Sequence, residues 1–220
     1  MNVYPGLLAL VLVSFAFYAR PTDGAGFNEP LAHLPLGSQE SLACGERSRI
    51  SWGDRGLMAL EGRASPYDSV SVPLGNAQAK VCYGRPSVRD REIFGGLVPY
   101  DSLWRLGANE PTTIHLPVAA EIAGLAVAPG SYTLYSVPGR DRWTIIVNRS
   151  TSQWGLESDY TEDVRAQEVG RASVPSAPAL SFVETFTIRA EGTGASSANL
   201  LVEWENTFVA IPIVRTGPSD

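Results

Sequence analysis

Hydrophobic and polar residues alternate along most of the chain after residue 65, as they do in half-buried β-strands. Residues 70–74 and 79–83 alternate on either side of a Gly-Asn turn, which indicates a β-hairpin. The same pattern predicts strands at 112–116, 131–137, 142–148, 182–190, 200–204 and 208–214. About eight short strands separated by turns predict an all-β fold, specifically an antiparallel β-sandwich of the jelly-roll type.

Two stretches interrupt the alternation. Residues 157–179 are polar and then rich in Pro, which predicts a long connection with one short helix near 162–167. The segment Arg91 to Thr113 contains Gly95-Gly96 and Pro99 together with aromatic and charged residues. These residues predict one structured long loop, which is either functional or packed for structural reasons.

The first residues are strongly apolar. Leu7 to Ala19 is a continuous hydrophobic run, shorter than the ~20 residues that span a membrane, and it fits the core of a signal peptide. No Lys or Arg precedes the run, so an uncleaved anchor is the alternative. The expected organisation is 1–19 signal peptide or N-terminal hydrophobic segment, 20–64 linker or arm with short strands at 49–52 and 57–60, 65–214 β-sandwich domain and 215–220 tail. We therefore expect an exported protein, periplasmic or extracellular, with no membrane span in the mature chain.

The two cysteines agree with export. Cys44 and Cys82 predict a disulfide, with two unrelated buried thiols as the alternative. Such a bridge closes a loop of about 39 residues, for which the chain-entropy model gives roughly 4 kcal/mol. Two cysteines without suitably spaced histidines do not form a zinc shell, so no metal is expected, and no cofactor either.

Composition narrows the function classes. With 44% hydrophobic and 18% charged residues, the chain can bury a sizeable core. Its net charge of −6 argues against a nucleic-acid partner, which needs a concentrated basic face.

Support for catalysis is weak. The chain has no serine-hydrolase elbow, no zinc-protease motif and no phosphate-binding loop. Of its two histidines, His33 lies in the expected arm and His115 in an expected strand. Glu203 and Glu205 flank Trp204 and share one strand face, where paired carboxylates are usually solvated. The protein is therefore more readily interpreted as a non-enzyme, and the sequon Asn148-Arg149-Ser150 as a chance match.

Five separated motifs resemble one protein family. They are "SPYDSV", "YGRPSVRDREIFGGLVPYDSLWRLGANEPTTI", "PGSYTLYSVPG", "WTIIVNRSTSQWG" and "LLVEWENTFVAIPI". In this order, from Ser65 to Val214, they resemble the bacterial domain-of-unknown-function family 2911. The resemblance implies an exported or envelope-associated β-rich domain without an assigned activity. Tyr67 stands where the family pattern has His, and Pro111 where it has Ala, so no role of that His is carried over.

The candidate site is the 91–113 loop with nearby residues. The functional hypothesis is a polar and aromatic patch that binds a small polar ligand, such as a carbohydrate. The structural alternative is that the aromatic residues plug the sandwich, while buried Arg105 pairs with Glu110 or Asp101. Whether the loop containing Gln153 meets the 91–113 loop is left open. The candidate residues are Arg85, Tyr100, Trp104, Arg105, Asn109, Glu110, Gln153 and Trp154.

The leading functional hypothesis is thus an exported, non-enzymatic β-sandwich protein that binds a small polar ligand or a protein partner through this loop. One alternative is an envelope hydrolase that uses carboxylates such as Glu110. Another is an assembly protein that forms homo-oligomers through exposed strand edges or the arm at 20–36.

Overall fold

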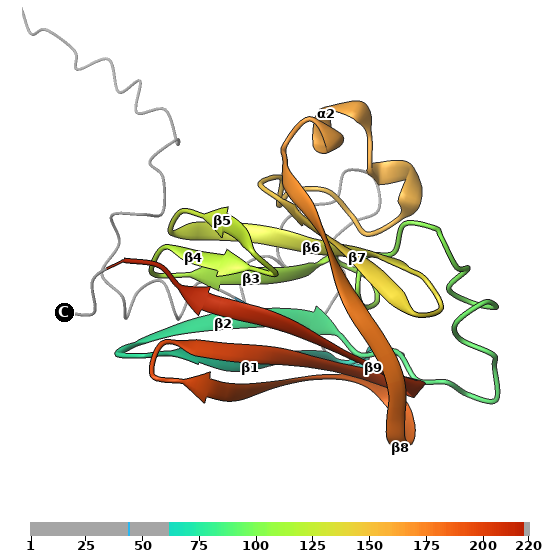
Figure 1. The fold of residues 1–220 in the computed structure, drawn as a ribbon. Helices are drawn as coiled ribbons and strands as arrows, with labels where there is room; N and C mark the ends of the chain where they lie inside the picture. Colours follow the sequence, from blue (N-terminus) through green and yellow to red (C-terminus); the bar gives the residue numbers. More distant parts are fainter. Residues whose placement is uncertain (1–43, 45–61, 218–220) are drawn as a thin grey trace, which may run out of the picture. The chain divides into compact units, whose positions relative to one another are not determined.

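The described part of the chain consists almost entirely of antiparallel β-strands (Figure 1). The computed structural model describes Cys44 and residues 62–217. Its strands pair in the order β1-β2-β3-β6-β7-β8-β9-β4-β5, as one open nine-stranded sheet. The strands are β1 (Tyr67–Leu74), β2 (Ala77–Gly84), β3 (Thr112–Leu116), β4 (Ala120–Ile122), β5 (Leu125–Val127), β6 (Gly130–Pro138), β7 (Arg142–Asn148), β8 (Glu168–Gly194) and β9 (Ser197–Arg215). The predicted all-β antiparallel fold is confirmed, and the jelly-roll-like sandwich stays a prediction.

Strand β8 connects the two parts of the sheet. Its residues 168–175 pair with β7, and its residues 176–194 pair with β9, so the strand changes neighbours midway (Figure 1). Pro175 and Pro178 lie at this change of neighbours. Proline has no backbone N–H, and at this position its absence removes few hydrogen bonds from either ladder. The prediction that 157–179 is one connection is therefore wrong from Glu168 onward.

A cluster of aromatic rings lies in the hydrophobic core. Trp143 of β7, Phe186 of β8 and Trp204 of β9 surround Phe94 and Trp104, which the 91–113 loop inserts between them. The Trp104 ring stacks on that of Trp204 at 5.8 Å and meets the other rings edge-on. Such pairs contribute about 0.5–1.5 kcal/mol each beyond their burial. The loop thus completes the core.

The helices are few and short. A 3-10 helix, η4 (Glu157–Asp159), and an α-helix, α2 (Glu162–Arg165), form what we call the helical cap. Thr161 caps the N-terminus of α2, because its hydroxyl accepts a hydrogen bond from the backbone N–H of Val164. The short helix expected near 162–167 is therefore present. None of the helices among residues 62–217 has the length and apolar character to cross a membrane.

Other local predictions differ from the structure. The expected strands 200–204 and 208–214 are one strand, β9, in which Glu205 has a φ of 54° and marks an irregularity instead of a break. Strands β4 and β5 were not predicted, because three residues are too few to show a period of two. The N-terminal segment 1–19, the expected strands at 49–52 and 57–60 and the last residues of the tail lie outside the described residues.

The predicted disulfide is present. Cys44 and Cys82 are bonded, with their Cα atoms 5.8 Å apart and a separation of 38 positions in the sequence. Cys82 lies fully buried on β2. The bridge therefore attaches Cys44 to the second strand of the sheet.

Candidate functional site

The middle of the 91–113 loop is hydrogen-bonded to β6. The backbone of Trp104 exchanges two hydrogen bonds with that of Ser136, at 2.7 and 2.8 Å, and the N–H of Asp101 donates to the carbonyl of Pro138. The indole N–H of Trp104 donates to the carbonyl of Gly107 at 3.1 Å. With only 5% of its surface exposed, Trp104 belongs to the core and offers no open face to a ligand.

The loop meets the segment around Gly155, a contact that the sequence alone left open. Nη1 of Arg105 donates a hydrogen bond to the carbonyl oxygen of Gly155 at 2.9 Å. A Cβ at position 155 would lie 2.1 Å from the carbonyl oxygen of Asn109 and 2.3 Å from Cδ of Arg105. Only glycine fits there, so the two segments touch backbone to backbone. We call Arg105, Asn109, Gly155 and Glu157 the loop junction.

Arg105 is incompletely paired at this junction. Its Nη1 lies 3.8 Å from Oε1 of Glu157, whose side chain is 63% exposed. Its Nε is buried and has no hydrogen-bond partner among the described residues. Burial lowers the pKa of Arg105, and the nearby carboxylate of Glu157 opposes that change. The expected pairing of Arg105 with Glu110 or Asp101 is wrong, because the guanidinium points toward Gly155 and Glu157 instead.

Glu110 has a different partner. Its Oε2 accepts a hydrogen bond from Nη1 of Arg63 at 2.7 Å, and both side chains are more than nine-tenths buried. Sequence reasoning missed Arg63, because it lies 47 positions earlier, in the presumed arm. The ion pair joins that segment to the end of the 91–113 loop, and it keeps Glu110 away from solvent.

Gln153 belongs to a buried hydrogen-bond network with Tyr135 and Ser150. Its amide donates to the hydroxyl of Tyr135 at 3.0 Å and to the carbonyl of Ser150 at 3.2 Å, and its carbonyl accepts from the Ser150 hydroxyl. Burial raises the pKa of Tyr135, and the bond from Gln153 opposes the change. Gln153 is buried, whereas its sequence neighbour Trp154 is half-buried.

A second buried network holds the helical cap onto the sheet. The Asn148 amide donates to the carbonyl of Val164 at 2.7 Å and to the hydroxyl of Tyr160 at 3.3 Å. Tyr160 in turn donates to Oε1 of Glu168 at 2.8 Å, and burial raises the pKa of Tyr160 to about 12. Asn148 is fully buried, so its sequon is inaccessible to a glycan in the folded chain.

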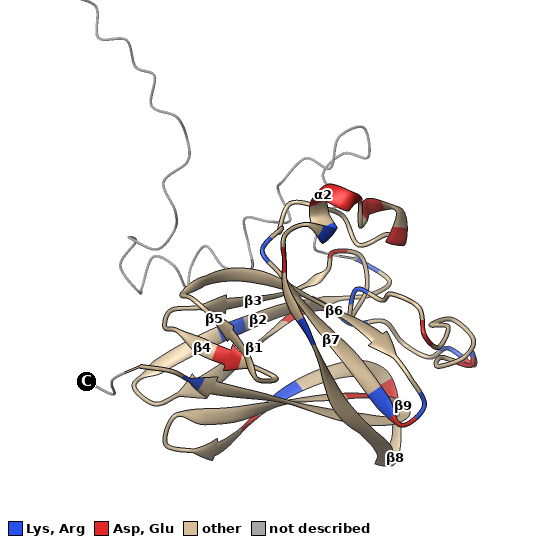
Figure 2. Cartoon of the chain, turned by 45° about the horizontal axis from the view of Figure 1, so that its top comes forward, with Lys and Arg blue, Asp and Glu red and all other residues tan. Residues whose placement is uncertain are grey.

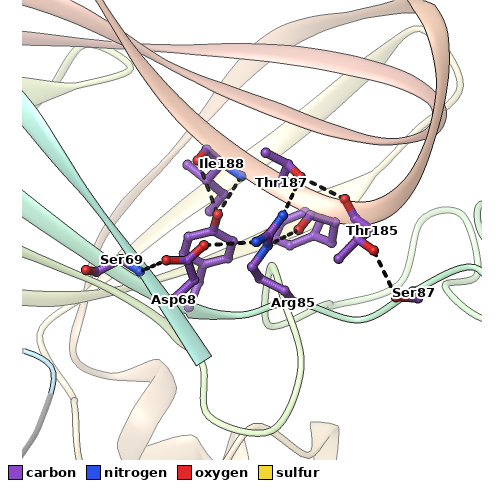
Figure 3. A network of polar contacts seen from close by, with 9 residues as sticks. Asp68, Ser69, Arg85, Ser87, Thr185, Thr187 and Ile188 are labelled. Carbon is purple, nitrogen blue, oxygen red and sulfur yellow. Dashed lines mark hydrogen bonds and ion pairs between the residues drawn. The ribbon is translucent and has the colours of Figure 1, made fainter. Parts of the chain in front are cut away.

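Arg85 and Tyr100 lie apart from the junction. The Arg85 guanidinium bonds Asp68 of β1 at 3.1 Å and Thr187 of β8 at 3.2 Å, which ties the end of β2 to both strands (Figure 3). The Tyr100 ring lies 4.6 Å from the guanidinium carbon of Arg140. Of the candidate residues, the structure brings Arg105 and Asn109 together with the segment that carries Gln153 and Trp154.

Other candidate chemistry is distributed over the strands. Glu203 bonds Arg189, and Glu205 accepts a hydrogen bond from the backbone N–H of Ile93. His115 shares a hydrogen bond of 2.7 Å with Ser131 across β3 and β6. Within the described ranges, no three His, Cys, Asp or Glu side chains are grouped so that they could hold a metal ion.

Acidic residues predominate on the helical cap that follows the junction in the sequence. Red segments in Figure 2 mark the helical cap, which carries Glu157, Asp159, Glu162 and Asp163. An anionic ligand that approached Arg105 would meet this negative charge. Neutral polar ligands would meet both hydrogen-bond donors and acceptors.

One comparison with known proteins places the chain in a family. A family model described as "Protein of unknown function (DUF2911)" matches residues 65–213. No curated protein and no solved structure matches the chain. The matched residues run from just before β1 almost to the end of β9, which is more than half of the sequence. The chain therefore belongs to the DUF2911 family of proteins of unknown function.

Proposed function

We propose that this protein is an exported, non-enzymatic binding protein whose loop junction takes a small neutral carbohydrate. The observation that carries the proposal is the gap of 3.8 Å between Nη1 of Arg105 and Oε1 of Glu157. The gap is too long for a direct hydrogen bond. A sugar hydroxyl lying beside the pair can bridge the two groups, since it can accept from the guanidinium and donate to the carboxylate at once.

The surroundings of this pair support a sugar. Trp154 is half-buried and precedes Gly155 in the sequence, and an aromatic residue in the same segment as charged hydrogen-bonding groups suits a polyhydroxylated ring. Tyr135, which is close enough to Arg105 to influence its pKa, is held by a hydrogen bond from Gln153, so this part of the junction is ordered before a ligand arrives. The acidic cap favours a neutral sugar over a sugar acid.

The non-enzymatic assignment rests on the carboxylates. Glu110, the strongest candidate for an acid or base, is buried in its ion pair with Arg63, and Glu203 is bonded to Arg189. A hydrolase needs two carboxylates that face a substrate, with pKa values moved apart. Export is supported by the disulfide, because such bonds persist mainly in oxidising compartments.

Titration of the full chain with sugars, followed by NMR, tests the proposal. Glucose, galactose, N-acetylglucosamine and cellobiose would be compared with glucuronate. We expect at least one neutral sugar to shift the resonances of Arg105 and of the Trp154 indole, and glucuronate to bind more weakly. Arg105→Gln and Glu157→Gln should each weaken binding about tenfold or more, as the loss of a hydrogen bond to a charged group does.

The matched control is Glu162→Gln on the same cap. Its side chain is 92% exposed and makes only a weak pair with Arg165, so affinity should not change. The proposal fails if no sugar shifts these resonances at millimolar concentration. It also fails if binding is unaffected by both junction variants.

A further inference from the structure

A second surface, independent of the loop junction, lies midway along β8. Pro178 pairs with Thr207 and Val183 pairs with Glu205, so residues 179–182 bulge out of the β8–β9 ladder (Figure 1). Within this bulge the Leu180 side chain is fully exposed, and Phe182 is 55% exposed. They are the two most exposed large hydrophobic residues in the described part of the chain.

We propose that this bulge inserts shallowly into the surface of a lipid bilayer. A convex protrusion with two apolar side chains offers about 400 Å² at most. A stable protein interface needs about 800 Å² from each partner, so the bulge is too small to hold a second copy of the chain. Lipid needs no complementary surface, and side chains such as Leu and Phe bury themselves at its interface.

The charges around the bulge indicate which lipid it meets. The turn at 139–142 packs against the start of the bulge, where Ser176 donates hydrogen bonds to the carbonyls of Asp141 and Arg140. Charges of both signs lie on each side of the bulge: Arg140, Asp141 and Arg142 near its start, and Glu184 with the bonded segment 89–92, which carries two Arg, one Asp and one Glu, near its end. With the overall net charge of −6, nothing here attracts an anionic surface. We therefore infer binding to zwitterionic lipid that does not depend on salt.

The backbone sets the depth of insertion. Residues 179–182 lie outside the ladder, and unsatisfied N–H and C=O groups are costly in the hydrocarbon core. At the level of the head groups, water still satisfies them. Only the side chains of Leu180 and Phe182 should therefore pass below the head groups.

A tryptophan placed in the bulge reports its insertion directly. The full chain also contains the apolar run Leu7 to Ala19, which can bind lipid by itself, so the readout has to be local. Phe182→Trp and, as a matched control on β9, Val214→Trp would be mixed with phosphatidylcholine vesicles that carry brominated acyl chains. Val214 is likewise exposed, but it lies beside β4. We expect quenching and a blue shift for Phe182→Trp, and neither for Val214→Trp.

Two further measurements distinguish lipid insertion of the bulge from its burial against a second copy of the chain. Adding Leu180→Ser to Phe182→Trp should lower vesicle partitioning about tenfold, as the loss of one inserted apolar side chain does, whereas adding Leu156→Ser should not. Equal quenching at positions 182 and 214 would overturn the proposal. So would a blue shift of the Phe182→Trp variant that grows with protein concentration without lipid, because a second copy would then cover the bulge.

Discussion

Arg105 donates a hydrogen bond of 2.9 Å to the carbonyl oxygen of Gly155, across 50 positions of sequence. This contact brings the segment before the helical cap against the 91–113 loop. It also directs the guanidinium away from Glu110 and toward the exposed carboxylate of Glu157. The polar part of the candidate site therefore depends on one backbone approach that only glycine permits.

Gly155→Ala should destabilise the fold by about 1–3 kcal/mol, as overpacking does, because the new methyl group would overlap the carbonyl oxygen of Asn109. Urea unfolding measures the loss. Gly192→Ala is the control, since a Cβ there meets only Pro73 at an ordinary 3.8 Å. Equal stability of the two variants would show that the loops do not touch as described.

Trp104→Ala should cost roughly 3–5 kcal/mol, because it leaves a large cavity among the rings of the core. Thermal unfolding measures the effect. Leu97→Ala in the same loop should leave the melting temperature almost unchanged, since Leu97 is about half exposed. If the Trp104 variant melted like the wild type, the indole would have to lie at the surface, where it could bind a ligand.

Glu110→Gln should destabilise by about 1.5–3 kcal/mol, because it removes the buried carboxylate that accepts a hydrogen bond of 2.7 Å from the guanidinium of Arg63. Glu203→Gln is the control: its partner Arg189 is exposed, and such pairs contribute about 0–1 kcal/mol. Denaturant unfolding measures the free energy of unfolding of both variants. An equally small loss in both variants would argue against a buried pair at Glu110.

Acid should loosen the helical cap through Glu168. Two hydrogen bonds from Arg171 hold the pKa of Glu168 below its ordinary value, and Tyr160 donates a third. A carboxyl group whose pKa is lowered by folding stabilises the folded state at pH values above the pKa that it has in the unfolded chain, about 4.3 for Glu. This contribution is lost as the pH falls through the pKa of the folded state.

Glu168→Gln should therefore reduce the loss of stability below about pH 4.3. Urea unfolding between pH 6 and pH 3 gives the comparison. Glu162→Gln, with its exposed carboxylate, should follow the wild type. If the free energy of unfolding of wild type and of Glu168→Gln changed with pH in parallel, Glu168 would titrate alike in the folded and the unfolded chain.

The non-reduced protein should contain no reactive thiol, and reduction in denaturant should release two. Replacing both Cys44 and Cys82 by Ala should lower the free energy of unfolding by roughly 4 kcal/mol, because the unfolded chain is no longer crosslinked. Labelling with a thiol reagent and mass spectrometry measure the first effect, and urea unfolding measures the second. Two reactive thiols in the untreated protein would contradict the bridge.

The sequence was informative wherever the physical signal is local. A period of two indicates a strand with one face buried, which is why β3 was predicted at its observed bounds, Thr112–Leu116. Polar and Pro-rich composition misled the prediction at the start of β8, because that strand is half exposed where it leaves β7 and Pro is tolerated at the change of partner. The short hairpin β4–β5 has no such signal.

For the candidate site, the sequence indicated the segment but not the arrangement. The types of residue in the 91–113 loop suggested aromatic packing and a paired Arg. Which residue faces the core, and which carboxylate meets which guanidinium, depends on contacts between distant segments. Arg63 and Gly155 became visible only when those segments were placed together.

By itself, the sequence determined the all-β antiparallel class, the hairpin of β1 and β2, and the family to which residues 65–213 belong. These follow from alternation along neighbouring residues and from motifs read in order. Tertiary structure alone decided that Trp104 completes the core, that Glu110 pairs with Arg63, and that Arg105 is left facing Glu157. The reason is that burial and ion pairing depend on which distant segments the folded sheet brings together, and neighbouring residues do not encode that.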